Sequence, residues 1–158
     1  MTRSAKKSGK RQPLEMQHFI FEIKEWVPCY SLSVNHDKFR ETAFREHVGI
    51  DLNAVCVFPQ SLAGRSVELY VVGDRHCLKP AILQDDPGWR PRCVGALEWS
   101  PSRSNFYVGV PHESVPVITT ALAHGLFRYV ETYGPPLKRS KSLCSEFRFL
   151  QTVNLEEY

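Results

Sequence analysis

Chemically active side chains are densest in one short segment, residues 73–77 (GDRHC), which directly follows an apolar stretch. A carboxylate, an imidazole and a thiol at a strand end suit acid–base or nucleophilic chemistry, and a nearby cation lowers the pKa of a thiol. Neighbours on an extended chain point to opposite faces, however, and Gly-Asp after a strand is typical of a turn. Asp74, His76 and Cys77 are therefore the candidate catalytic residues of an alternative interpretation, a small enzyme of unknown class.

Metal and cofactor chemistry has little support in the sequence. Structural zinc sites usually take closely spaced ligand pairs such as CxxC, and the residues His76, Cys77, Cys93 and His112 contain no such pair. The sequence also lacks GxGxxG, GxxxxGK[ST], GxSxG and HExxH motifs. We expect no bound metal and no cofactor.

A second pair of polar side chains, His47 and Asp51, has the spacing that places both on one face of a strand. His47 and Asp51 are an even number of residues apart on a predicted strand, so their side chains project from the same face. The sequence places no nucleophile beside them. A solvated polar face is the favoured interpretation.

The cations gather at the N-terminus. Residues 1–14 carry five of them and no acid, so with a net charge of +3 for the whole chain the remainder sums to −2. Such a segment attracts nucleic-acid phosphates without base specificity, and a solubilising terminus is the open alternative. The predicted nucleic-acid contacts are Arg3, Lys6, Lys7, Lys10, Arg11, Lys138, Arg139 and Lys141.

One loop is predicted to contact a protein partner. Residues 80–91 hold three prolines, a glycine and paired acids, a composition typical of a long exposed loop. A tryptophan in such a loop is rarely fully buried, and exposed aromatic and arginine side chains often anchor interfaces. We predict Trp89, Arg90 and Arg92 as partner contacts.

The length of 158 residues is that of one compact domain. We expect a disordered basic tail over residues 1–14 and a single strand-rich globular domain over residues 15–158. Five widely spaced cysteines, an odd number, indicate reduced thiols, with Cys29, Cys56 and Cys93 as ordinary buried ones. No stretch approaches the length of a membrane span or a secretory h-region, so we expect a soluble, cytoplasmic protein with no membrane partner.

Most of the chain shows the two-residue alternation of strands. The first strand is expected to end before Pro28. A change in the parity of the apolar positions predicts a bulge or bend near Asn53, in the strand over 47–58. Residues 35–44 suit a short helix or a structured loop equally. Strands are predicted over residues 18–27, 30–34, 47–58, 66–72, 93–99, 105–110, 126–133 and 143–153.

One helix stands out, over residues 114–124. Val115, Ile118 and Leu122 recur at helical spacing, Ser114 is placed as the N-cap, and Gly125 suits a left-handed C-cap.

About eight strands and one helix, with short connections, predict a mainly β (α+β) fold. We expect an antiparallel β-sandwich or part-open barrel with one packed α-helix. The leading functional hypothesis is a non-enzymatic interaction module that binds a protein and contacts nucleic acid weakly through its tail.

Overall fold

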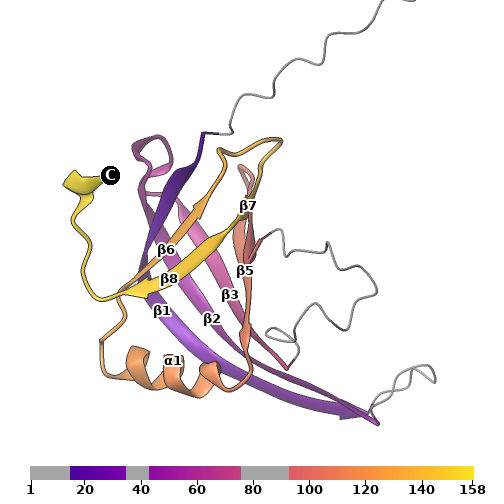
Figure 1. Cartoon of the computed structure of the whole chain (residues 1–158). Helices are drawn as coiled ribbons and strands as arrows, with labels where there is room; N and C mark the ends of the chain where they lie inside the picture. The colour runs from indigo at the N-terminus through magenta and orange to yellow at the C-terminus, as the bar shows by residue number, and fades with distance from the viewer. Residues whose placement is uncertain (1–14, 35–42, 76–92) are drawn as a thin grey trace, which may run out of the picture.

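The computed structural model describes residues 15–34, 43–75 and 93–158 (Figure 1). The predictions for the basic tail, for residues 35–42 and for the loop 80–91 lie outside these residues. The elements, in chain order, are β1 Gln17–Val34, β2 Phe44–Phe58, the 3-10 turn Gln60–Leu62, β3 Ser66–Asp74, β4 Gly95–Trp99, β5 Ser104–Pro111, α1 Ser114–Ala123, β6 Tyr129–Gly134, β7 Lys141–Cys144, β8 Glu146–Leu150 and the 3-10 turn Leu155–Glu157.

The strands form one sheet in the order β7-β4-β5-β3-β2-β1-β6-β8. The mainly β fold with one packed helix is confirmed. The expectation of a wholly antiparallel sheet is wrong, because β3 pairs with β5 in parallel while the other neighbours are antiparallel. The parallel pair follows from the strand order. β4 comes next in the chain after β3 but does not pair with it, and β5 then returns by a hairpin to the position between β4 and β3.

The two edge strands of the sheet, β7 and β8, are consecutive in the chain. β7 pairs with β4 and β8 pairs with β6, yet only Ser145 separates β7 from β8. Its amide donates to the carbonyl of Tyr133 at 2.8 Å. The sheet is therefore nearly closed into a barrel, and the single C-terminal strand predicted over 143–153 is in fact two.

The first two strands are much longer than the rest and leave the barrel together (Figure 1). Contrary to the prediction, β1 does not end at Pro28, which pairs with Ile50 inside the continuous strand. A proline cannot donate to a ladder, but this position tolerates one more readily because β1 pairs on one side only here. The two strands predicted on either side of Pro28 are thus one.

The predicted bulge lies in the partner strand. Ile23 pairs with Ala54 and Glu25 pairs with Asn53, so Lys24 is the extra residue and the bulge is in β1. β2 keeps its alternation here, with Leu52, Ala54 and Cys56 all directed into the core.

The core fills the barrel and continues beneath α1. Val115, Ile118 and Leu122 are buried as predicted, and Gly125 has a φ of 67°. The amide of Leu126 donates to the carbonyl of Ala121 at 2.9 Å, which is the six-to-one bond of a Schellman C-cap. The predicted N-cap is wrong by one residue, because Ser114 is the first helical residue and Glu113 occupies the cap position without a side-chain hydrogen bond.

Candidate functional site

The most distinctive surface is the ribbon that β1 and β2 form beyond the barrel, which we call the arm. It comprises residues 30–34 paired with residues 44–48. β3 pairs with β2 only from Gly49 onwards, and β6 pairs with β1 only as far as Glu22. Within the described residues, no strand pairs with either outer edge of the arm, although the end of β3 lies against Val48.

The register places the large apolar side chains on one face of the arm, its inner face. Tyr30 pairs with Val48, Leu32 with Glu46 and Val34 with Phe44, and directly paired residues share a face. The opposite face is polar and comprises Ser31, Ser33, Arg45 and His47. The four large apolar residues of the inner face are exposed by more than half: Tyr30 by 64%, Leu32 by 56%, Val34 by 57% and Phe44 by 59%.

The inner face continues into a groove against α1. The groove has a volume of about 460 Å³. Figure 1 shows α1 next to the stretch where the two long strands leave the barrel. The lining residues are Pro28, Cys29, Tyr30, Val48, Gly49, Val115, Pro116, Thr119 and Thr120.

Glu46, the charged residue within the inner face, is paired with the cation Arg75. Arg75 donates a hydrogen bond to its carboxylate, and His112 Nε2 lies 3.4 Å from the same oxygen. The hydrogen bond from Arg75 is the main reason that the pKa of Glu46 lies below its usual value. The inner face thus presents little net charge.

The other face carries a thiol that the register places between the two polar residues singled out by their spacing. Cys29 lies opposite Gly49, with its Sγ 3.6 Å from His47 Nε2 and 4.0 Å from Asp51 Oδ1. Burial, and secondarily the charge of Asp51, raise the pKa of Cys29. The thiol is therefore protonated at neutral pH and is a poor nucleophile.

Metal binding finds no support in the described part of the chain. Among residues 15–34, 43–75 and 93–158, no group of three or more His, Cys, Asp or Glu side chains is arranged to hold an ion. The cysteines described there are free thiols, and only Cys56 and Cys144 are fully buried. The prediction that Cys29 and Cys93 are also core thiols is wrong, because both are partly exposed.

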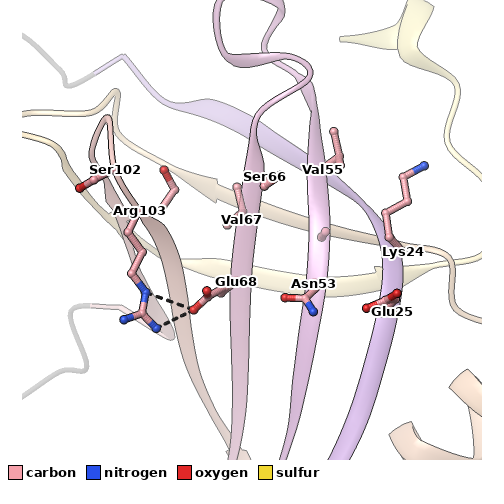
Figure 2. Close-up of a pocket in the computed structure, with 11 residues that line it drawn as sticks. Lys24, Glu25, Asn53, Val55, Ser66, Val67, Glu68, Ser102 and Arg103 are labelled. Atoms are coloured by element: carbon pink, nitrogen blue, oxygen red, sulfur yellow. Dashed lines mark hydrogen bonds and ion pairs between the residues drawn. The ribbon is translucent and has the colours of Figure 1, made fainter.

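A second groove, of about 350 Å³, lies on the outer side of the barrel (Figure 2). Glu25, Asn53 and Glu68 form one row across β1, β2 and β3. Arg103 donates to Glu68 at 2.6 Å and to the hydroxyl of Tyr70 at 2.8 Å, and Tyr70 donates to the same carboxylate. Arg103, Glu68 and Tyr70 therefore satisfy one another's hydrogen bonds. The cluster stabilises the local structure and does not indicate a ligand site.

One carboxylate is buried beneath the C-terminal residue. Glu131 is 1% exposed, and its oxygens accept from Arg148 Nε and contact His18 Nδ1, both at 2.6 Å. The ring of Tyr158 packs edge-on against His18 at 4.9 Å. Burial alone raises the pKa of Glu131, but hydrogen bonds from Arg148, His18 and Tyr158 outweigh it and lower the pKa.

Few of the residues predicted as sites lie in the described regions. Asp74 ends β3, whereas His76, Cys77, Trp89, Arg90, Arg92 and the tail cations fall outside them. Lys138 and Lys141 bond through their backbones across a turn that contains Arg139, and Lys141 also pairs with Glu98 at 2.6 Å. Asp74 is the only predicted catalytic residue among the described ones, so whether it meets His76 and Cys77 stays a prediction.

The inner face of the arm was not predicted as a site. The alternation of serine with larger residues over 30–34 indicated a strand, but it carried no information on which strands would lie beside it. The unpaired edges are a property of the sheet order.

Comparisons give no relative: no protein-family model, no curated protein and no solved structure matches the chain. The longest helix in the described residues, α1, has 10 residues and is too short to span a bilayer.

Proposed function

We propose that the protein is a non-enzymatic interaction module that takes an extended, apolar segment of polypeptide on the inner face of the arm. The observation that carries this proposal is the exposure of Tyr30, Leu32, Val34 and Phe44 on one face of the arm. The basic tail would add weak, salt-sensitive attraction to nucleic acid.

A two-stranded ribbon is only marginally stable by itself. Such a ribbon gains little stability in water unless a third strand or another layer covers it. Unpaired strand edges present backbone donors and acceptors to another chain, and an apolar patch of several hundred Å² marks an interaction site. An extended segment that lies across the inner face covers Leu32 and Val34 with its alternate apolar side chains.

The groove beside α1 extends the same surface. Val48 and Val115 form apolar walls close to Tyr30, and Thr119 and Thr120 offer hydroxyl groups at the rim. Both threonine hydroxyls donate to helix carbonyls at 2.9 Å, so they are already satisfied. The groove therefore suits the apolar side chain of a bound segment.

The experiment is site-specific photo-crosslinking in the cells that make the protein. A benzophenone amino acid replaces Leu32 in one variant and Ser33 in the other. Ser33 is the matched control because it neighbours Leu32 on the same strand but lies on the polar face. We expect a covalent adduct with a polypeptide at position 32, whose attached segment, read by mass spectrometry, alternates apolar and polar residues.

Two results would overturn the proposal. One is the absence of any polypeptide adduct at position 32. The other is equal crosslinking at positions 32 and 33, which would show that the contact has no preference for the apolar face.

A further inference from the structure

We infer that the segment bound by the inner face of the arm is the arm of a second copy of this chain, so that the protein is a twofold symmetric dimer. This inference rests on the proposed function and names its partner. In such a dimer the same patch is used by both protomers, and each contact occurs twice.

The charges on the inner face favour a like partner. Glu46 is its charged residue, and Arg75 compensates it within the same chain. Two identical faces can therefore meet without repulsion between like charges. A strongly basic or acidic partner would find no uncompensated charge of opposite sign on this face.

The size of the face also fits. Tyr30, Leu32, Val34 and Phe44, each exposed by more than half, offer roughly 500 Å² of surface per protomer. Two such faces together give about 1,000 Å², the lower limit for a specific interface. The groove beside α1 adds to this area.

A second arm also covers the apolar face that each arm exposes. The register makes the ribbon two-sided, with its large apolar residues on one face and Ser31, Ser33, Arg45 and His47 on the other. Packing the two apolar faces together leaves both polar faces in water. The result is a four-stranded, two-layer structure in which each ribbon covers the other.

The test is the mass of the purified full chain by sedimentation velocity over a range of micromolar concentrations. We expect twice the chain mass of 18.1 kDa. The double variant Leu32→Glu with Val34→Glu should raise the dimer dissociation constant by about 100-fold or more, because it places charges in the centre of the interface. The matched control is Ser31→Glu with Ser33→Glu, which adds the same charge to the polar face and should leave the dimer intact.

A second measurement makes the result independent of whether the charged variants fold. The purified benzophenone variant at position 32 should crosslink to itself and give an adduct of twice the chain mass. A monomer at every concentration, without this adduct, would overturn the dimer. So would a dimer that the control variant dissociates as strongly as the inner-face variant, or one that the inner-face variant leaves intact.

The same data separate this inference from the proposed function. If the purified chain is a monomer but position 32 still crosslinks to a different polypeptide in cells, the dimer is wrong and the interaction module stands. If position 32 crosslinks to nothing in either setting, both are wrong.

Discussion

Arg148 Nε donates to Glu131 Oε2 at 2.6 Å, and it does so across the β6–β8 pair to a carboxylate side chain that is only 2% exposed. The guanidinium itself is about half exposed, so the pair lies at the boundary between core and water. His18 contacts the other carboxylate oxygen. These contacts tie β1, β6 and β8 together where the barrel closes.

This arrangement predicts an acid-sensitive contribution to stability. The pKa of Glu131 is lowered in the folded protein, so its contribution is fully present above the unfolded value of about 4.5 and is lost as the pH falls through the lower folded value. At pH 7, Glu131→Gln should cost about 1–3 kcal/mol, because it weakens hydrogen bonds to a buried group.

Urea unfolding at pH 7 and at pH 3 measures this effect. The difference between the wild type and Glu131→Gln should shrink in acid. The matched control is Glu156→Gln in the exposed C-terminal turn, which should leave stability within about 0.5 kcal/mol at both values. A difference at position 131 that is independent of pH would contradict the assignment.

The two glycines in one cross-strand row should respond oppositely to a methyl group. Gly49 and Gly109 both pair with Val72, on either side of β3. A Cβ at Gly49 would lie 2.6 Å from the carbonyl oxygen of Val71, which is backbone and cannot move alone, whereas a Cβ at Gly109 would meet no atom within 4 Å.

We therefore expect Gly49→Ala to lower the free energy of unfolding by about 1–3 kcal/mol. Gly109→Ala should be neutral or stabilise by up to about 1 kcal/mol, because alanine restricts the unfolded chain. Chemical denaturation of the two variants provides the comparison. Equal effects at the two positions would show that β2 and β3 do not approach each other closely at Gly49.

The helix makes a simpler prediction. Leu122 is 5% exposed and belongs to the core, whereas Val117 on the same helix is 67% exposed. Leu122→Ala should cost about 2–5 kcal/mol through lost burial and the cavity left behind. Val117→Ala should change stability by less than about 0.5 kcal/mol. A loss below about 1 kcal/mol at Leu122 would mean that another face of α1 packs on the barrel.

The cysteines should separate by reactivity towards an alkylating reagent. Burial raises the pKa of Cys56 to about 11 and also raises the pKa of Cys144, so both should react only on unfolding. Cys77 lies outside the described residues, and its neighbour His76 predicts that it reacts first.

The pH dependence of alkylation at Cys77 then tests the alternative of an enzyme. An apparent pKa well below the ordinary value of about 8.5 would favour a catalytic thiol, and a value at or above it would remove that alternative. Cys77→Ser is the control that assigns the fast phase to this residue.

The basic tail makes the last prediction. Deleting residues 1–13 removes five cations and should weaken binding to DNA or RNA at low salt, with little change in melting temperature. Repeating the titration at high salt, where both proteins should bind poorly, checks that the effect is electrostatic. If the truncated chain binds as well as the full one, the tail is no tether.

Local sequence indicated where most of the strands and the helix lie, and which face of the helix is buried. Val115, Ile118 and Leu122 recur at helical spacing, and Gly125 ends the helix because it tolerates a positive φ. Alternation likewise marks the strands, including residues 30–34. These signals are readable because a helix or a strand repeats within a few residues, and burial of one face imposes that period on the sequence.

Only the tertiary structure decided how the strands pair and which apolar residues stay in water. The register sets Cys29 between His47 and Asp51, and Ser145 divides the last strand so that β7 and β8 pair at opposite ends of the sheet order. The exposure of Leu32 and Val34 follows from the same cause, since β3 joins β2 only from Gly49 onwards. Pairing depends on contacts between residues far apart in the chain, and a local pattern of Tyr, Ser and Leu is the same whether or not another strand comes to cover it.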